Sequence, residues 1–247
     1  MVDTIYIDAV YTKEIKLNKE ILDHLKKLAV KKLALFASVQ FLKLEIVKKQ
    51  LKELDIEILT TKAKRTDKDT QILGCDAYHE SFKDSIIDEA DVILYIGDGL
   101  FHPQAALYAQ IHSNTFKEII LYDPIGDHMR IIGKENIQEN IDKLRRNLKI
   151  FISAKTIGIT VTLKSGQQYL HGAMKLREKL NAEGKEAYIF LDNTIDMGHF
   201  ENYPFIEVWV NTACPRIGFD DIINAPKPLL NINYALDPIK YLETLQK

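Results

Sequence analysis

The chain contains two cysteines, and each stands in a segment whose composition suits ligand or metal binding. Cys75 follows the residues Gln-Ile-Leu-Gly, and Cys214 lies in the segment 211–216, Asn-Thr-Ala-Cys-Pro-Arg. The two thiols are too far apart in the sequence for a short Cys-x-x-Cys chelate, so the fold must assemble any chemistry that they share. The positive charge of Arg216 favours a thiolate at Cys214. The alternative is a small buried hydrophobic residue, which is the usual role of a lone cysteine.

Two polar turns have residue types that could contact an anionic or zwitterionic ligand. The segment 97–103, Gly-Asp-Gly-Leu-Phe-His-Pro, places backbone amides where they can approach an anion, while Asp98 attracts an amino group. A tight turn without a ligand explains the same glycines equally well. His102 suits a helix start, a ligand contact or a proton donor. The segment 164–167, Lys-Ser-Gly-Gln, is better explained as a helix N-terminus capped by Ser165. The other histidines show no metal-ligand spacing, and we expect them to be solvated or structural.

The elements that must position these residues alternate between short apolar strands and amphipathic helices. We expect strands over 32–38, 56–60, 92–96, 118–122, 157–163, 187–191, 208–210 and 229–232. We expect helices over 41–54, 103–112, 134–154 and 167–183. This alternation predicts an α/β fold of two similar domains with mainly parallel sheets of four to five strands flanked by helices. The polar turns end four of the strands, at 38–40, 97–103, 164–167 and 211–216. Because ligands bind at the carboxyl ends of parallel strands, we expect the site there, between the domains.

Composition and charge exclude several classes of protein. The chain has 247 residues, of which 46% are hydrophobic and 28% charged, values typical of a soluble globular α/β protein. A net charge of −2 without a basic tail gives no support to nucleic-acid binding. No apolar stretch is long enough for a signal peptide or a membrane span, and two distant cysteines form no disulfide framework. We therefore expect a cytoplasmic protein with no membrane partner.

Taken together, the ordered segments 71–75, 97–103 and 211–216 resemble those of archaeal diphthamide synthase, the 2-(3-amino-3-carboxypropyl)histidine synthase family. The resemblance covers essentially the whole chain, including 38–40 and 164–167. It implies three similar α/β domains that each donate one cysteine to a [4Fe-4S] cluster, which binds S-adenosylmethionine and cleaves it reductively. It also implies that a 3-amino-3-carboxypropyl radical is then added to a histidine of elongation factor 2, the first step of diphthamide formation.

Carried over residue by residue, the resemblance implies a set of site residues and domain boundaries. The metal ligands would be Cys75 and Cys214, and the S-adenosylmethionine contacts would be Gln40, Gly97, Asp98, Gly99, His102 and Gln167. No catalytic side chain is identified. Residues 1–28 would be the closing strand and helix of a first domain, 29–133 the middle domain and 134–247 the C-terminal domain. Phe41 replaces a histidine that the family tends to have beside the site.

The resemblance requires three cluster cysteines, whereas this sequence supplies two. We therefore expect a transferase component that acts in a homo- or hetero-oligomer with a chain supplying the missing cysteine. One alternative is a non-catalytic partner or scaffold subunit of a complete synthase. Another is a separately encoded first domain that docks on residues 5–7. A general α/β enzyme with Cys214 as nucleophile has little support, because no histidine is paired with it locally.

Overall fold

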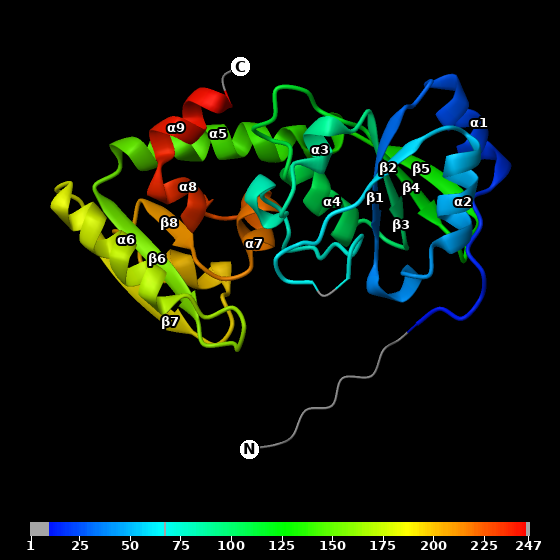
Figure 1. The fold of residues 1–247 in the computed structure, drawn as a ribbon. Helices are drawn as coiled ribbons and strands as arrows, with labels where there is room; N and C mark the ends of the chain where they lie inside the picture. The colour runs from blue at the N-terminus through cyan, green and yellow to red at the C-terminus, as the bar shows by residue number, and fades with distance from the viewer. Residues whose placement is uncertain (1–9, 67, 246–247) are drawn as a thin grey trace. The chain divides into compact units, whose positions relative to one another are not determined.

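The computed structural model describes residues 10–66 and 68–245 (Figure 1), and the chain divides after Asn136 into two compact units. Unit 1 ends at Asn136 and unit 2 begins at Ile137. Each unit holds one sheet flanked by helices, so the α/β class predicted from the alternation of strands and helices is confirmed. In the described part of the chain, no helix combines the length and the apolar character that a membrane crossing requires.

Unit 1 is built on a five-stranded sheet in the order β2-β1-β3-β4-β5. Its strands are β1 (Lys32–Ala37), β2 (Glu57–Leu59), β3 (Val92–Ile96), β4 (Ile119–Asp123) and β5 (His128–Ile132). The first four are parallel, and β5 runs antiparallel to β4. The strand pattern in the sequence did not predict β5, because most of its side chains are exposed and polar or charged residues interrupt the apolar run. The parallel strands nevertheless end at one edge, which we call the carboxyl edge of unit 1.

Two pairs of helices cover the two faces of this sheet (Figure 1). The helices of unit 1 are α1 (Lys19–Lys27), α2 (Glu45–Glu53), α3 (Ile86–Glu89) and α4 (Phe101–Tyr108), with short 3-10 turns η1 (Val39–Phe41) and η2 (His79–Ser81). One face of the sheet packs on α1 and α2 through a core that includes Leu25, Leu35, Leu51 and Leu94. Since side chains alternate along a strand, the residues between these face α3 and α4 instead. Helix α1 thus shares a core with the strands that follow it.

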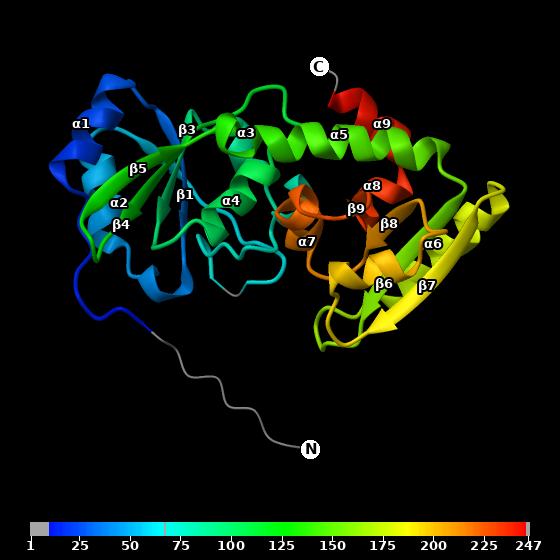
Figure 2. The ribbon, with the colours of Figure 1, turned by 180° about the vertical axis from the view of Figure 1, so that it is seen from behind.

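Unit 2 is built on a four-stranded, fully parallel sheet in the order β7-β6-β8-β9 (Figure 2). Its strands are β6 (Thr156–Thr162), β7 (Glu186–Asp192), β8 (Val208–Asn211) and β9 (Leu229–Asn231). Its helices are α5 (Gln138–Ser153), α6 (Leu170–Ala182), α7 (Pro215–Phe219), α8 (Ile232–Leu236) and α9 (Pro238–Thr244), with 3-10 turns η4 (Met197–Asn202) and η5 (Asp221–Ile223). A further 3-10 turn, η3 (Lys134–Ile137), spans the boundary between the units. Helix α6 packs on β6 and β7, and α5 contacts β8 and β9. All four strands end at a carboxyl edge of unit 2.

The expected cap at Ser165 is wrong, because α6 begins later than the sequence suggested. The helix starts at Leu170, and its N-cap residue Tyr169 makes no side-chain hydrogen bond to it. The segment 164–167 is instead a turn in which the Gln167 N–H donates to the Lys164 carbonyl at 3.1 Å. Gly166 takes a left-handed φ of +76° in this turn, which explains why glycine stands there.

Candidate functional site

The Cys75 loop is attached to the carboxyl end of β1. Ala37, the last residue of β1, donates its N–H to the Thr70 carbonyl at 2.8 Å. Its own carbonyl accepts the N–H of Ile72 at 3.2 Å. These two bonds extend the sheet by a short parallel bridge outside the named strands. Cys75 is therefore at the carboxyl edge of unit 1, three residues beyond Ile72, and its side chain is half-buried.

A buried carboxylate closes the turn that contains Cys75. The Asp76 N–H donates to the Leu73 carbonyl at 3.0 Å, and the Leu73 N–H donates to Asp76 Oδ2 at 2.8 Å. Burial raises the pKa of the Asp76 carboxyl above its ordinary value, against the opposing effects of the Leu73 N–H and the charge of Arg65. The two reciprocal bonds fix the backbone on either side of Cys75.

The Cys75 loop packs against α4 at Gly74, where the absence of a side chain leaves room for an aromatic ring. A Cβ at Gly74 would lie 2.6 Å from Cδ1 of Phe101 and closer still to Cε1, so the ring occupies the space of that side chain. Phe101 is the first residue of α4. Its ring also meets the half-buried His102 ring edge-on, with 5.5 Å between centroids. The Cys75 loop and the start of α4 are therefore in contact within unit 1.

The turn 97–100 between β3 and α4 presents most, but not all, of its amides outward. The Gly97 N–H donates to the Tyr122 carbonyl at 2.9 Å and thus belongs to the sheet. The N–H groups of Asp98, Gly99 and Leu100 donate to no acceptor in the part of the chain that the structure describes. Gly99 has a left-handed φ of +66°, and nothing lies within 4 Å of the position of its Cβ. Three consecutive outward amides form an arrangement that suits an anion.

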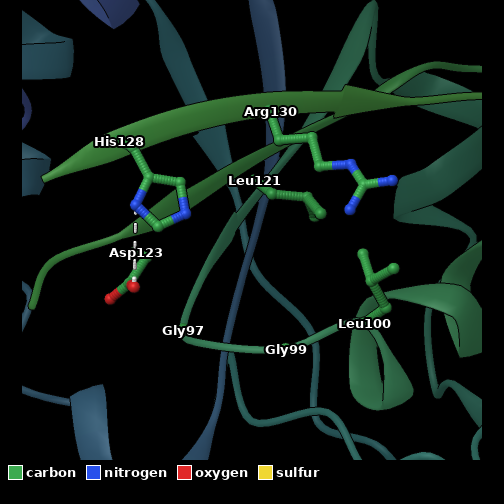
Figure 3. A pocket seen from close by; sticks show the side chains of 7 residues that line it. All are labelled: Gly97, Gly99, Leu100, Leu121, Asp123, His128 and Arg130. Carbon is green, nitrogen blue, oxygen red and sulfur yellow. Dashed lines mark ion pairs between the residues drawn. The ribbon is translucent and has the colours of Figure 1, made fainter. Parts of the chain in front are cut away.

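A cavity of about 170 Å³ opens beside this turn (Figure 3). Its lining residues are Gly97, Gly99, Leu100, Leu121, Asp123, His128 and Arg130. The first three come from the turn, and the other four come from β4 and β5, on the face that the alternation of strand side chains makes common to them. The sequence analysis did not single out Asp123, His128 or Arg130. The Asp-Pro-x-Gly-Asp pattern at 123–127 is a turn signal that could have revealed this hairpin.

Side-chain hydrogen bonds hold the β4–β5 hairpin in place. Asp127 Oδ1 accepts the Tyr122 hydroxyl at 2.9 Å and Nδ2 of Asn18 at 3.2 Å. Burial raises the pKa of Tyr122, so the phenol stays protonated and remains a donor. Asp123 Oδ1 accepts the Ile125 N–H at 2.8 Å, and its other oxygen lies 3.8 Å from Nδ1 of His128. The hairpin therefore gives β5 a defined position beside the cavity.

In unit 2, two buried asparagines position the backbone at Cys214. Asn211 Nδ2 donates to the Cys214 carbonyl and to Asn231 Oδ1, both at 2.8 Å. Asn211 Oδ1 accepts the Ala213 N–H at 3.0 Å. Asn231 Nδ2 in turn donates to the Pro215 carbonyl at 2.8 Å. The half-buried Cys214 thus follows β8 in a loop where side-chain amides hold the carbonyls of Cys214 and Pro215.

Arg216 is placed differently from the expectation that its charge serves Cys214. Its side chain is only 4% exposed, and its Nη2 lies 2.6 Å from a carboxylate oxygen of Asp220. The guanidinium therefore has a carboxylate of its own, which offsets its effect on the thiol. Burial, and then the charge of Asp220, raise the pKa of the neighbouring Asp221, while Arg216 opposes them.

The two candidate glutamines lie on different units. Gln40 is in η1 after β1, at the carboxyl edge of unit 1, and Gln167 is in the turn after β6, at the carboxyl edge of unit 2. Both side chains are exposed. Among the histidines, His79 and His199 face carboxylates at the surface, which agrees with a structural or solvated role.

The two cysteines are the residue type that binds iron in iron–sulfur clusters. Within the described residues, no three His, Cys, Asp or Glu side chains gather as a metal site. Each unit instead supplies one half-buried thiol, from a loop closed by hydrogen bonds at its carboxyl edge. Cluster ligands that come from separate loops are a known arrangement for thiolate-bound iron.

Comparison with known proteins matches residues 1–235 to the family described as "Putative diphthamide synthesis protein". Subunit 1 of 2-(3-amino-3-carboxypropyl)histidine synthase from Yarrowia lipolytica is 33% identical over 162 residues, which are 65% of this chain and 34% of that protein. The 2-(3-amino-3-carboxypropyl)histidine synthase of Pyrococcus horikoshii is 31% identical over 160 residues, 65% of this chain and 42% of that protein.

A solved structure, that of Dph2 from Pyrococcus horikoshii with a 4Fe-4S cluster, is similar with a TM-score of 0.67 and 26% identity. The similarity covers 91% of this chain and 60% of that one. The chain thus spans less than half the length of these two curated relatives and three fifths of the solved chain.

Proposed function

Because this chain belongs to the diphthamide synthesis protein family, we propose that it is a component of a 2-(3-amino-3-carboxypropyl)histidine synthase. It acts with a [4Fe-4S] cluster to transfer a 3-amino-3-carboxypropyl group from S-adenosylmethionine to a histidine of elongation factor 2. A further chain, identical or different, contributes the third cluster cysteine. The observation that supports this most is that each of the two cysteines stands in a hydrogen-bonded loop at the carboxyl edge of its own sheet.

In this proposal Cys75 and Cys214 bind iron as thiolates. When bound, the cluster supplies an electron and an open iron site for reductive cleavage of the carbon–sulfur bond of S-adenosylmethionine. The turn at Leu73–Asp76 and the Asn211 amide hold the backbone at the two cysteines in place. Fixed ligands keep the reacting atoms in one geometry, which is the main contribution that a protein makes to cofactor chemistry.

The remaining candidates orient the substrate. The outward amides of the turn 97–100 bind its carboxylate, and Asp98 attracts its ammonium group. Gln40 and Gln167 offer amide contacts from exposed positions at the two carboxyl edges. His102, beside the Phe101 ring, orders the start of α4.

Anaerobic reconstitution tests this function. The chain is reconstituted alone and with a full-length relative, followed by iron counting, EPR and detection of methylthioadenosine after dithionite reduction. The Cys75→Ala and Cys214→Ala variants should each lose iron and product, whereas Ser85→Ala, at an exposed serine of unit 1, should match the wild type. Absence of a cluster in the wild type, both alone and with the relative, would overturn the proposal.

A scaffold function is the second candidate, because this sequence has two cysteines where a cluster of the expected kind uses three. Such a subunit would stabilise a complete synthase or hold elongation factor 2 without binding iron. The measured quantity is the increase in product formation when this chain is added to the full-length partner. If Cys214→Ala leaves this increment unchanged, the scaffold function replaces the catalytic one.

A further inference from the structure

The cavity beside the turn 97–100 contains a cationic side chain that the proposed function has not used. Arg130 lies on β5, opposite Leu121 of β4, on the face that lines the cavity. Figure 3 shows its side chain extending along β5 toward the Leu100 end of the turn. No carboxylate pairs with its guanidinium among the residues that the structure describes. The N–H groups of the Arg130 guanidinium are therefore available to a ligand in the cavity.

The turn across the cavity adds further donors. The amides of Asp98, Gly99 and Leu100 donate to nothing in the described residues. A buried phenol also lies beside Gly97: the Tyr95 hydroxyl is 2.6 Å from the position of a Gly97 Cβ. Tyr95 is 1% exposed, and its hydroxyl has no hydrogen-bond partner of normal geometry, although Ser38 Oγ is close enough to affect its pKa. The cavity thus has donors on two sides, the guanidinium on β5 and the amides of the turn, with the Tyr95 phenol behind the turn.

Negative groups lie on the same cavity and its rim. Asp123 lines the cavity with a side chain that is 20% exposed, and Asp98 is exposed next to Gly97. A phosphate or another dianion would be repelled by these carboxylates. A ligand that carries both a carboxylate and an ammonium group matches both signs of charge. The cavity is therefore suited to the amino-acid end of a small molecule.

We infer that Arg130 binds the α-carboxylate of S-adenosylmethionine in this cavity, with the outward amides of the turn 97–100 as additional donors. Asp98 or Asp123 receives the ammonium group. A guanidinium binds a carboxylate through two parallel hydrogen bonds, which fixes the orientation of the ligand as well as its affinity. The identity of the ligand rests on the proposed function. Arg130 is then a specificity residue, which selects ligands that carry the α-carboxylate.

Ligand binding to three variants of the full chain tests this inference. Equilibrium dialysis measures the affinity for S-adenosylmethionine and for its decarboxylated analogue, which lacks only the carboxylate. The variants are Arg130→Gln, Arg130→Lys and the control Arg146→Gln, an exposed arginine on α5 of unit 2. Because Arg130 is exposed, circular dichroism should show that all three variants fold like the wild type.

Wild type and Arg146→Gln should prefer S-adenosylmethionine over the decarboxylated analogue by about tenfold or more. Arg130→Gln should remove most of this preference by weakening only the carboxylated ligand, and Arg130→Lys should retain part of it. An unchanged preference in Arg130→Gln would overturn the inference and leave the proposed function standing. Displacement of S-adenosylmethionine by millimolar inorganic phosphate would also overturn it. A wild type that binds neither ligand would overturn the inference, whereas the proposed function is decided by the cluster measurement.

Discussion

Replacing Gly74 by alanine should destabilise unit 1 through a collision with Phe101. The new Cβ would lie 2.6 Å from Cδ1 and 2.7 Å from Cζ of the ring, whereas carbon atoms are in contact at roughly 3.5–4.0 Å. The ring must therefore move by about 1 Å or more. Gly74 is not in the left-handed region, so the backbone itself accepts alanine.

The size of the effect follows from two opposing contributions. Forcing an extra methyl group into a packed contact costs about 1–3 kcal/mol. Alanine also restricts the unfolded chain, which returns about 0.4–1 kcal/mol. Phe101 is 52% exposed and can swing outward, which keeps the cost toward the lower end. We expect a net loss of about 1 kcal/mol in the free energy of unfolding.

A double-mutant cycle isolates this collision. Urea denaturation followed by far-UV circular dichroism is measured for Gly74→Ala, Phe101→Ala and the double variant. Once the ring is gone, Gly74→Ala should be neutral or slightly stabilising, so the coupling energy should be about 1 kcal/mol. Additivity within about 0.3–0.5 kcal/mol would refute the reasoning. A Gly74→Ala variant as stable as the wild type would refute it as well.

Three further predictions concern the groups around the two cysteines. Asn211→Ala should lower the free energy of unfolding by about 2–4 kcal/mol, because it removes three hydrogen bonds, one buried and two part-buried, as urea denaturation would show. Asp220→Asn should lower the pKa of Asp221, since it removes a repulsive charge and leaves Arg216 in place; carbon-13 NMR titration measures this. Asp76→Asn should become more favourable relative to the wild type as pH rises. A carboxyl whose folded pKa is raised contributes stability below its unfolded pKa and loses it as pH rises through the folded value, and urea midpoints from pH 3 to pH 7 measure the difference.

Each of these three has a result that contradicts it. For Asn211→Ala, the control is Asn202→Ala at an exposed position, and equal stability of the two variants would mean that the buried amide is not important. For Asp221, an unchanged pKa would assign its shift to burial alone. For Asp76→Asn, a difference from the wild type that is constant with pH would mean that the carboxyl titrates as it does in the unfolded chain.

The fold was largely predictable because the central strands of both sheets are buried on two faces. Strands such as β3 and β6 are continuous runs of apolar or β-branched residues, and such runs between amphipathic helices identify a parallel sheet. Strand β5 escaped prediction for the opposite reason: it is an edge strand with exposed charged side chains, so no hydrophobic pattern marks it. The start of α6 was misplaced because Gly166 and Gln167 form a turn of their own before the helix.

Residues of the candidate site could be proposed from the sequence only where the residue type alone suggests a chemical role. Cysteine and glycine singled out Cys75 and Gly97 in the sequence, because a thiol can bind metal and a glycine turn can expose its backbone amides. Arg130 was not singled out, since its position on the cavity comes from the pairing of β5 with β4, which is a long-range property of the fold. Asp76 and Asn231 were missed in the same way, because their partners are backbone groups that no sequence pattern identifies.

The asparagine pair of unit 2 has a consequence for how the protein recovers from metal loss. Asn231 reaches the Cys214 loop from β9, and its side chain occupies the space that a Cβ at Gly218 would need. The loop is thus held by amide groups that oxygen and chelators do not attack. If the chain binds a cluster as proposed, loss of the iron would leave the backbone at Cys214 in place, so reloading would require no refolding of the loop and its rate would depend on iron supply.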